Sequence, residues 1–590
     1  MSELVLPTIK VKQRKIDEEL EQAGINFGLH PLVVRIIASR NVPLDKFEEI
    51  ISPRLSFLDS PDKLTDIDIA AARVAKAIIN KECIGLETDH DCDGQTSHAV
   101  FYDCLINYFN FPKEKLRSYI GHRLTEGYGL SESVAKRILN DDIVPNLVIT
   151  ADNGSTDEPR ISLLKENGID VIVTDHHEIP LDGIPKSAYA VLNPTRKDCD
   201  YPDPYIAGCM VAWLLMAKTR QVLIKEGYLA SDAKSIKEVL DFVAVGTVAD
   251  CVSIAKSVNN RAVVRYGLHL ISKGVRPCWQ VILDLIDDDV VTSEDLGFKL
   301  GPLLNSDGRL ACAFGSVSFL LSEDISQATK WLEHLQEKNK ERKAIQASIT
   351  DKSMIEASKQ LLVGKLSLCI YLPEGHSGVH GIVASRVREA FGMPVIIFSP
   401  KQGVEGVLTG SARSTDELHL KDALEDVSVN NPNLLLGFGG HSGAAGASIL
   451  LKDFDRFSLA FEDAVAKQIN KSLLGPVVYT DGVINSSSIN LNFIEELDKV
   501  LQPYGREFEA PVFEVEAKVL NIIAIGDKTH AALELSVDDC YHKAIWFRAR
   551  NSESEEFPVK EGVRANFVVS LKKDVWRQEK RLKLQVLCVK

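Results

Sequence analysis

The sequence predicts a multidomain α/β protein: a parallel-sheet domain, a long connecting helix, a second α/β domain and a small C-terminal β-barrel. Its 590 residues exceed the size at which one hydrophobic core stops growing, so several domains are expected. From about Asp68 to Pro180, short β-rich runs alternate with helical stretches, as in a parallel sheet covered by helices. From about Val477 onward, hydrophobic alternation broken by turn residues indicates the barrel.

Composition and charge place the chain among ordinary globular proteins, with 45% hydrophobic and 26% charged residues. The formal net charge of -15 argues against coating nucleic acid by bulk electrostatics, so any nucleic-acid path must be local. The 11 cysteines are scattered without a C-x-x-C pair, which fits a reducing cytoplasm better than a zinc ribbon or disulfide framework. Residues 1–22 lack the apolar segment of a secretion signal, and no later stretch is long enough to span a bilayer.

Three runs in the first α/β region each end in an aspartate. The run–aspartate pairs are Cys83–Thr88 before Asp89, Leu147–Ala151 before Asp152, and Val171–Thr174 before Asp175. In open α/β sheets, ligands bind in the crevice beyond the carboxyl ends of the strands. We therefore expect these three acids to converge.

Beyond this region, residues 326–362 form a polar, helical segment that we interpret as a long connector. Leu366–Leu372 and Pro394–Phe398 follow as expected strands of the second α/β domain, which ends near the glycine cluster at 437–446. The final segment, Lys560–Lys590, is locally basic and contains Trp576. Basic residues around an aromatic ring suit a single-strand-binding surface, although a solvated strand face explains them equally well.

The strongest local signal is the set Asp89, Asp91 and Asp93, which stands directly before Gly94 where a strand gives way to a helix. Three carboxylates this close repel one another unless cations hold them. A calcium EF-hand loop is excluded, because its twelfth position would be Val100 instead of a bidentate acid.

Histidine and further acids join this set. In Asp175-His176-His177, adjacent histidines cannot both point the same way from an extended strand, so one would bind metal and the other would orient water or a substrate phosphate. The residues leave open which does which. Asp250 closes the apolar run Phe242–Ala249 and is either a further ligand or a helix-terminal acid. Mixed carboxylate and imidazole ligands suit Mn²⁺ or Mg²⁺.

These motifs occur in an order that resembles the DHH phosphoesterase superfamily. The motifs are Asp89–Gly94, Asp152–Gly154, Asp175–His177 and Gly246–Asp250. Four more stretches make the chain similar to the RecJ family of exonucleases over nearly its whole length: Arg123–Leu130, Gly301–Leu310, Gly381–Arg386 and Gly439–His441.

The resemblance implies a DHH domain, a linking helix, a DHHA1 domain and a C-terminal OB-fold barrel. The expected parts are an N-terminal segment packing on the DHH domain (1–65), the DHH catalytic domain (66–325), the connecting helix (326–362), the DHHA1 domain (363–470) and a nucleic-acid-binding OB-fold (471–590).

The resemblance also implies roles for particular residues. The expected metal ligands are Asp91, Asp93, Asp152, His176 and Asp250. The expected catalytic set is Asp89, Asp91, Asp93, His176, His177 and Asp250, in which Asp89 and His177, like Asp175, support the ligands or orient the substrate. The expected substrate-binding residues are Arg123, Arg309, His376, Ser411, Arg413 and His441.

The implied activity is hydrolysis of single-stranded DNA from the 5′ end, with release of 5′-mononucleotides, in DNA recombination and repair. Mn²⁺ or Mg²⁺, as two ions, would be the cofactor. A single-stranded-DNA-binding protein and a RecQ-type helicase would be partners of a cytoplasmic monomer. The 5′→3′ polarity rests on the resemblance alone.

Two other functions are compatible with parts of the sequence. A DHH phosphodiesterase for oligoribonucleotides or cyclic dinucleotides usually needs only two domains, so the chain beyond Val477 speaks against it. A non-catalytic replication or repair scaffold would have lost metal ligands, whereas the set here is complete.

Four features depart from the pattern typical of RecJ proteins. They are His90, Cys92, the run Asn305-Ser306-Asp307, and Gly375 in a position where a tryptophan is common. None of them removes an expected metal ligand. Gly375 puts one stacking contact with the substrate in doubt.

Overall fold

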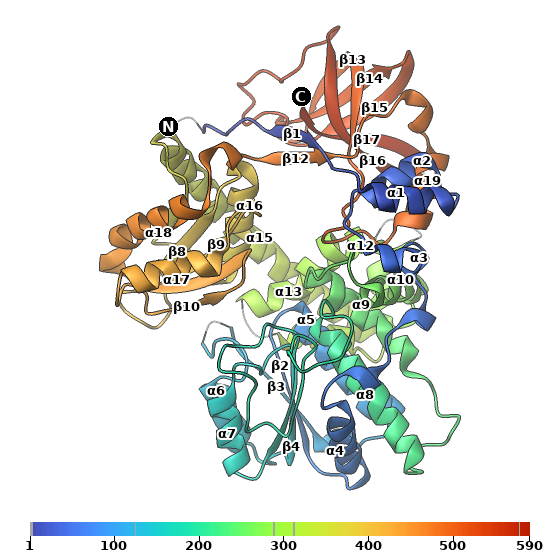
Figure 1. The fold of residues 1–590 in the computed structure, drawn as a ribbon, viewed down its shortest axis with the longest axis vertical. Helices are drawn as coiled ribbons and strands as arrows, with labels where there is room; N and C mark the ends of the chain where they lie inside the picture. The colour runs from blue at the N-terminus through green and yellow to red at the C-terminus, as the bar shows by residue number, and fades with distance from the viewer. Residues whose placement is uncertain (1–3, 124, 287–289, 311–312, 577–578) are drawn as a thin grey trace. The chain divides into compact units, whose positions relative to one another are not determined.

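The structure is a computed structural model that describes residues 4–123, 125–286, 290–310, 313–576 and 579–590 (Figure 1). The chain forms two compact units. The N-terminal unit comprises Ile16–Asn339 with Ile494–Ala510, and the C-terminal unit comprises Met1–Lys15, Lys340–Phe493 and Pro511–Lys590. The side chain of Trp576 lies outside the described part, so its stacking role stays a prediction.

A five-stranded parallel sheet forms the centre of the N-terminal unit, in the order β3-β2-β4-β5-β6. Every residue of β2 and β4 is buried, as expected of strands covered on both faces. Thr88 pairs with Ala151 and Ala151 pairs with Thr174, so three strands end level with one another. The strands are β2 (Ile84–Thr88), β3 (Leu116–Ile120), β4 (Leu147–Ala151), β5 (Asp170–Thr174) and β6 (Ala190–Leu192). The three predicted strand runs are confirmed to within one residue.

Helices surround this sheet and continue beyond it (Figure 1). The N-terminal helices are α1 (Glu18–Asn26), α2 (Pro31–Ala38), α3 (Phe47–Ile51) and α4 (Ile67–Ile79). Those between and after the strands are α5 (Cys92–Asp103), α6 (Glu132–Leu139), α7 (Glu158–Glu166), α8 (Gly208–Lys225), α9 (Leu240–Ala249), α10 (Val258–Ser272), α11 (Pro277–Leu283), α12 (Ser293–Asp295), α13 (Gly301–Leu310) and α14 (Phe314–Leu320). A π-helical turn, Leu296–Leu300, joins α12 to α13. Helices α5, α8 and α9 pack against one another beside the ends of the strands.

A segment distant in sequence completes the N-terminal unit. Ile494–Ala510, which includes most of α19 (Leu491–Leu501), lies within this unit. Arg261 on α10 is fully buried and donates hydrogen bonds to the carbonyl oxygens of Ile50, Leu501 and Pro503, at 2.8, 3.0 and 3.2 Å. Burial lowers the pKa of Arg261 to about 9. These three carbonyls therefore fasten the returning segment to α10 and to the N-terminal helices.

The C-terminal unit contains a mixed five-stranded sheet in the order β10-β11-β9-β8-β7. Strands β7 and β8 are parallel, and the other pairs are antiparallel. The elements are β7 (Leu368–Tyr371), α16 (His380–Phe391), β8 (Val395–Pro400), β9 (Val407–Arg413), α17 (Leu420–Asn430), β10 (Gly437–Gly440), β11 (Ala444–Leu450) and α18 (Phe454–Gln468). Helix α15 (Ile325–Leu362) is the predicted connector and runs from one unit into the other.

A closed barrel of five strands, in the order β13-β14-β15-β17-β16, forms the end of the chain. Its strands are β13 (Phe513–Ile525), β14 (His530–Val537), β15 (Cys540–Trp546), β16 (Arg564–Trp576) and β17 (Glu579–Val589). The predicted barrel is confirmed, but its strands begin later than the alternation from Val477 indicates. Strand β12 (Val477–Thr480) pairs in parallel with β1 (Lys10–Gln13) instead. Alternation identifies a strand but does not identify its partner.

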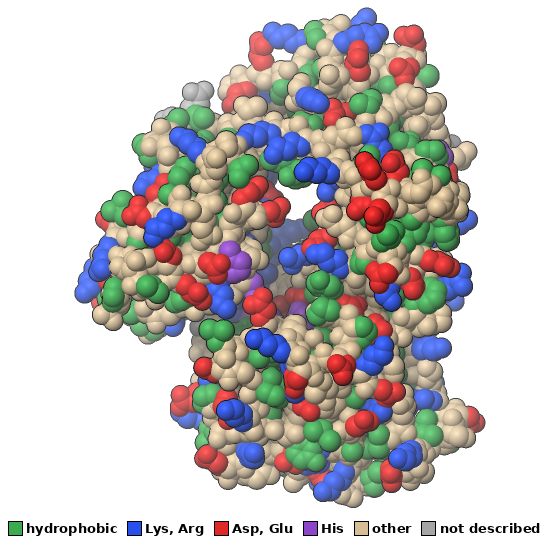
Figure 2. All heavy atoms as spheres, viewed as in Figure 1, with side chains coloured by type: hydrophobic (Ala, Val, Ile, Leu, Met, Phe, Trp, Pro, Cys, Tyr) green, Lys and Arg blue, Asp and Glu red, His purple; other side chains and the backbone are tan. Residues whose placement is uncertain are grey.

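Charged side chains of both signs are interspersed over the face seen in Figure 2. Across the described ranges, no helix combines the length and the apolar character that crossing a membrane requires.

His98 should make the N-terminal unit sensitive to mild acid. Its imidazole is buried on α5, where Nδ1 lies 3.3 Å from Thr88 Oγ1 and Nε2 lies 3.0 Å from Ser118 Oγ. Burial lowers the pKa of His98 from 6.5 to about 4. As pH falls below 6.5 the unfolded chain binds a proton there and the folded chain does not, so the free energy of unfolding falls.

The free energy of unfolding should fall between pH 7.5 and pH 5.5. We predict that this fall is roughly 1 kcal/mol smaller in His98→Gln than in the unmodified protein. Hydrogen exchange of the β2 and α5 amides, corrected for intrinsic rates and measured with metal chelated, gives this difference. An identical pH dependence in the variant and the unmodified protein would contradict the assignment.

Candidate metal centre

The first acidic motif lies where β2 passes into α5. Asp91 is the N-cap of α5, and its Oδ1 accepts hydrogen bonds from the amides of Asp93 and Gly94 at 3.0 and 3.2 Å. Asp89 Oδ1 lies 3.0 Å from His90 Nδ1. The carboxylates of this motif therefore lie in the turn that caps α5.

Asp93 is held by the N-terminus of another helix. Its two carboxylate oxygens accept hydrogen bonds from the amides of Gly208 and Cys209, at 2.7 and 2.9 Å. These amides begin α8, where unpaired N–H groups and the helix dipole favour a negative charge. Because its side chain is fully buried, Asp93 is fixed in place by α8.

Glycine at two helix contacts permits this close packing. A Cβ at Gly208 would lie 2.9 Å from Asp152 Cβ, and a Cβ at Gly246 on α9 would lie 2.8 Å from Asp93 Oδ1. Both approaches are shorter than ordinary van der Waals contacts. Helices α8 and α9 can therefore approach Asp152 and Asp93 this closely only because these positions have no side chain.

Asp175 organises the two histidines after β5. Its Oδ1 accepts hydrogen bonds from the amides of His176 and His177, at 2.8 and 3.1 Å, and lies 2.8 Å from His177 Nδ1. The amide of Ser155 donates to its other oxygen at 3.0 Å. Asp175 thus orients His177, while His176 turns its Nε2 toward other acids.

His176 Nε2 is the point on which the carboxylates converge. It lies 3.1 Å from Asp152 Oδ1, 3.6 Å from Asp250 Oδ2 and 3.8 Å from Asp93 Oδ2. Asp152 follows β4 in a left-handed conformation (φ +62°), and Asp250 is the C-cap of α9. Side chains from four separate stretches of the sequence therefore meet in one place.

The electrostatics of this cluster favour bound cations. Burial raises the pKa of Asp152 and Asp250 well above the usual carboxyl range, and the charge of Asp93 raises both further. Burial would raise the pKa of Asp175 as well, but the hydrogen bond and charge of His177 outweigh it and lower that pKa. Burial opposes protonation of His177, yet the Asp175 carboxylate raises its pKa to about 9.

The donor set fits divalent cations. Three groups of side chains offer ligand atoms within 4.8 Å of one another: Asp152, His176 and His177; Asp93, His176 and Asp250; and Asp89, Asp91 and Asp152. Oxygen-rich sets with one or two imidazoles suit Mn²⁺, and Mg²⁺ accepts the carboxylates. All five expected metal ligands belong to these groups, and Asp89 and His177 join them.

Arg123 and the aromatic Tyr128 lie near this centre, and the backbone just before Arg309 packs against its first acidic motif. The positive charge of Arg123 is among the groups that lower the pKa of Asp89. The residue before Arg309, Gly308, packs so closely that a Cβ there would lie 2.1 Å from the His90 carbonyl oxygen. Tyr128 Oη donates to the Asp152 carbonyl oxygen at 3.0 Å, and its ring centroid lies 6.0 Å from that of His177.

The remaining expected substrate-binding residues belong to the C-terminal unit. Arg413 at the end of β9 lies 3.4 Å from Ser411 Oγ, and its strand partner Ala444 lies close to His441 in the adjoining hairpin. His376 caps the turn before α16, where its Nδ1 accepts from the Gly378 amide at 3.2 Å, and burial lowers its pKa. Ser411, Arg413 and His441 are thus neighbours within this unit.

The departures from the RecJ pattern have structural partners of their own. Asn305 Oδ1 accepts from the Cys92 amide at 2.9 Å. Asp307 accepts from the Gly315 amide at 3.0 Å and lies 3.1 Å from His334 Nε2 on α15. At Gly375 a Cβ would lie 2.8 Å from Ser399 Cβ, which explains the absence of a larger side chain.

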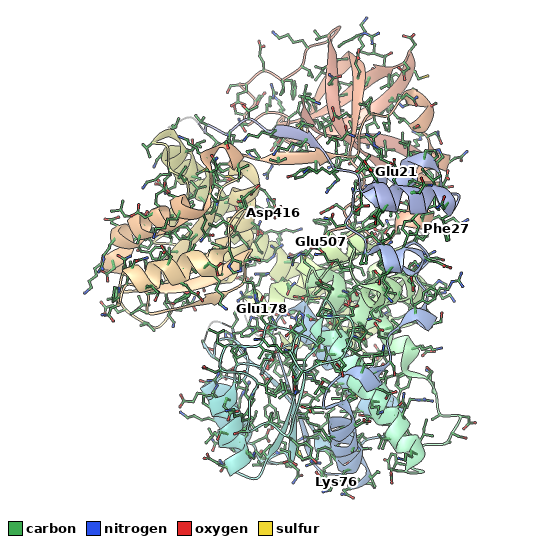
Figure 3. The ribbon with its side chains drawn as sticks, viewed as in Figure 1. Glu21, Phe27, Lys76, Glu178, Asp416 and Glu507 are labelled. Carbon is green, nitrogen blue, oxygen red and sulfur yellow. The ribbon has the colours of Figure 1, made fainter. Side chains whose placement is uncertain are left out.

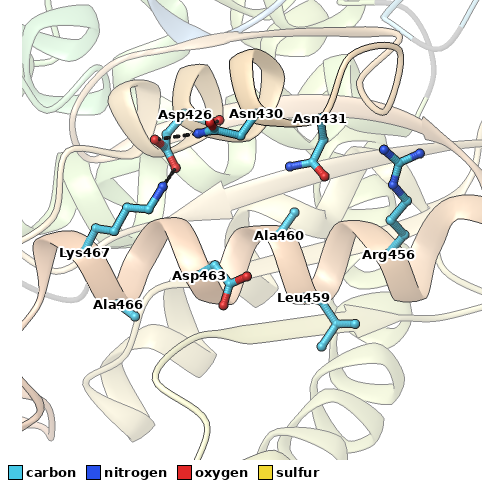
Figure 4. A pocket seen from close by; sticks show the side chains of 9 residues that line it. All are labelled: Asp426, Asn430, Asn431, Arg456, Leu459, Ala460, Asp463, Ala466 and Lys467. Atoms are coloured by element: carbon cyan, nitrogen blue, oxygen red, sulfur yellow. Dashed lines mark hydrogen bonds and ion pairs between the residues drawn. The ribbon is translucent and has the colours of Figure 1, made fainter.

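A cavity of about 480 Å³ lies elsewhere, between α17 and α18 of the C-terminal unit (Figure 4). Its wall includes an ion pair between Asp426 Oδ2 and Lys467 Nζ at 2.7 Å. None of the nine lining residues belongs to the expected site, so this cavity supplies control positions for experiments.

Comparison with known protein families defines the class of this protein. Residues 83–247 match the DHH family N-terminal domain, residues 359–467 match the DHHA1 domain, and residues 480–587 match the RecJ OB domain. The parallel sheet that carries the acidic cluster is thus a DHH domain, and the protein is of the DHH/DHHA1 class.

The single-stranded-DNA-specific exonuclease RecJ of Haemophilus influenzae is 34% identical over 89% of this chain and 89% of its own length. The Escherichia coli protein of that name is 33% identical over 88% of this chain and 89% of its own length. The chain belongs to the RecJ family.

Solved structures agree with this assignment. The Mn²⁺ complex of RecJ from Thermus thermophilus covers 100% of this chain and 80% of that chain, with a TM-score of 0.76 at 22% identity, which shows the shared fold. An exonuclease RecJ bound to manganese is 28% identical, with a TM-score of 0.56 over 68% of this chain and 95% of that chain.

The sequence did not reveal two features of the centre. One is the pair of α8 amides on Asp93, for which the only signal is a glycine at the start of an apolar helix. The other is Tyr128, an aromatic residue between two glycines within an already identified motif.

We predict that Gly208→Ala weakens Mn²⁺ binding by about tenfold, because the new methyl group must displace Asp152 or the α8 amides that hold Asp93. Isothermal titration calorimetry with Mn²⁺ measures this change, and circular dichroism monitors folding. Gly297→Ala is the matched control, since its nearest contact would be an ordinary 3.6 Å to Val248. Equal Mn²⁺ affinity in the two variants would show that the packing of α8 does not control the centre.

Proposed function

We propose that this protein is a metal-dependent, single-stranded-DNA-specific exonuclease that hydrolyses phosphodiester bonds from the 5′ end and releases 5′-mononucleotides. The observation that carries the proposal is the convergence of Asp93, Asp152, Asp250 and His176 at the carboxyl end of a DHH sheet. The names of the relatives supply the substrate, and the polarity rests on resemblance to the family.

In this proposal Asp91, Asp93, Asp152, His176 and Asp250 are the metal ligands. The distances from His176 Nε2 to three carboxylates support it as the ligating histidine. His177, whose Nδ1 is engaged by Asp175, would face the substrate instead. Asp89 would support the ligands from beside Asp91.

Two divalent cations in such a site can activate a water molecule and stabilise the oxygen that departs from phosphorus in an in-line displacement. The protein supplies position and charge. The α8 amides keep Asp93 from rotating, and Asp175 keeps the His177 ring in one orientation. His177, with its ring held by Asp175, would donate a hydrogen bond to a phosphate oxygen.

Substrate binding would use residues of both units. Arg123 and Arg309 of the N-terminal unit, and His376, Ser411, Arg413 and His441 of the C-terminal unit, would bind the 5′ end and the backbone. Guanidinium groups bind phosphate in bidentate fashion. The basic strands β16 and β17 would also contact the DNA strand.

The proposed setting is DNA recombination and repair in the cytoplasm, with a single-stranded-DNA-binding protein and a RecQ-type helicase as partners of a monomeric enzyme. The ten described cysteines are all free thiols, which supports a reducing compartment. We also propose the domain limits given above, with the DHH, DHHA1 and OB-fold parts at 66–325, 363–470 and 471–590.

We predict that Asp93→Ala and His176→Ala each lower Mn²⁺-dependent cleavage of single-stranded DNA at least about a hundredfold, because each removes a group from the metal centre. Release of acid-soluble nucleotides from a labelled strand measures the rate. Asp426→Asn, in the cavity of the C-terminal unit, is the matched control and should cleave at the unmodified rate. Retained cleavage in both site variants, with folding verified by circular dichroism, would refute the assignment.

We predict that a strand labelled at its 5′ end loses its label at once as a mononucleotide, whereas a 3′-labelled strand shortens progressively. Gel electrophoresis of both strands with Mn²⁺ separates the two polarities.

Comparing the cleavage of a long DNA strand with that of a dinucleotide, at equal phosphate concentration, separates this function from a small-substrate phosphodiesterase. Binding without any cleavage would indicate the scaffold function instead.

A further inference from the structure

A loop from the returning segment places a guanidinium group beside the metal centre. Arg506 follows α19 by five residues, and its Nη1 lies 3.4 Å from the carbonyl oxygen of Cys251, the residue next to Asp250. The Arg506 side chain therefore contacts the residue that follows a proposed metal ligand, although 256 residues separate Arg506 from Asp250 in the sequence.

The loop that carries Arg506 is held firmly. The amide of Ile254 donates to the Arg506 carbonyl oxygen at 3.0 Å, and Gly505 and Phe508 exchange backbone hydrogen bonds of 3.0 and 3.1 Å across the turn. A Cβ at Gly505 would lie 2.5 Å from Ile254 Cγ1, so the backbone sits directly on the segment after Asp250. The guanidinium is thus presented from a fixed backbone.

The residue after Arg506 anchors the loop from the other side. Glu507 accepts a hydrogen bond from Ser253 Oγ and forms an ion pair with Lys256 Nζ at 2.9 Å. Figure 3 labels Glu507 together with Glu178, which follows the two histidines; both lie on the side of the N-terminal unit toward which the parallel strands run. The Arg506 loop accordingly lies on the same side as the centre.

The charge of Arg506 is not paired with a carboxylate in the described part of the chain. Among the residues that the structure describes, Arg506 forms no ion pair, and its one side-chain hydrogen bond is the long contact to Cys251. The side chain is exposed. By contrast, neighbouring Lys256 is neutralised by Glu507. An exposed arginine without a carboxylate partner, beside a cluster of acids, is suited to bind an anion.

We propose that Arg506 binds a phosphate group of the DNA substrate on the Asp250 side of the metal centre. This inference rests on the proposed function and adds to it a substrate-binding residue from the segment between α19 and the barrel. A phosphate entering the centre meets several carboxylates, whose repulsion must be offset. The Arg506 guanidinium, beside Cys251, would offset it.

A purely structural role makes different predictions. If Arg506 only supported the Cys251 carbonyl and hence Asp250, its loss would weaken Mn²⁺ binding and leave the salt dependence of DNA cleavage unchanged. If it binds phosphate, its loss removes one ionic contact with DNA. The logarithm of kcat/KM should then fall less steeply with the logarithm of salt concentration, by about 0.7 for one phosphate on a single strand.

The test uses the full-length protein with Mn²⁺ and a labelled DNA strand. Arg506→Gln should lower kcat/KM about tenfold at low salt, mainly through KM, and flatten the salt dependence by about 0.7. Arg506→Lys should restore part of the loss and the original salt slope, because it keeps a point charge. Mn²⁺ affinity, measured by calorimetry, should not weaken in either variant.

Arg220→Gln is the matched control. Arg220 lies on α8 in the same unit and also donates to backbone carbonyls, of Ala233 and Lys234, but it is about 18 Å along the helix from the amides on Asp93. It should match the unmodified protein throughout. An unchanged kcat/KM and salt slope in Arg506→Gln, or weaker Mn²⁺ binding with an unchanged slope, would overturn the inference. Absence of cleavage by the unmodified protein would instead refute the proposed function.

Discussion

The hydrogen bonds from the first amides of α8 to Asp93 are the constraint on which the centre depends. They fix a carboxylate of α5 against a helix that begins 115 residues later. The absence of side chains at Gly208 and Gly246 lets α8 and α9 approach closely enough for Asp152 and Asp250 to reach the same point. Without that approach the acids would remain at separate strand and helix ends, each solvated on its own.

Bringing these acids together costs folding free energy, because burial and mutual repulsion both disfavour their charged forms. The raised pKa of Asp152 and of Asp250 expresses this cost. A cation removes the repulsion and replaces lost hydration, so metal binding and the folded arrangement support each other. The hydrogen bonds to Asp175 have the opposite effect, since two backbone amides and His177 stabilise its negative charge. Asp175 thus orients His177, and the neighbouring acids remain available to metal.

Sequence reasoning predicted the parts of the fold and site that are local. The strand ends before Asp89, Asp152 and Asp175 were visible because a buried parallel strand is a short apolar run and its final aspartate breaks that run. Contacts between distant segments were not visible. The pairing of β1 with β12, the later start of the barrel strands and the α8 amides on Asp93 depend on tertiary packing that leaves no periodic pattern. The orientation of the His177 ring likewise depends on the Asp175 carboxylate, whose position the sequence does not reveal.

The position of Arg506 is another contact between distant segments that the sequence does not predict. In the sequence it is an arginine in a polar loop, where a solubility role is the ordinary expectation. Its place beside Asp250 follows from Arg261, which draws the carbonyls of Leu501 and Pro503 into the N-terminal unit. A buried arginine with carbonyl acceptors is costly unless all of those acceptors are present. The returning segment therefore belongs to the catalytic unit for an energetic reason, and a phosphate-binding group on that segment gains the rigidity of the unit to which it returns.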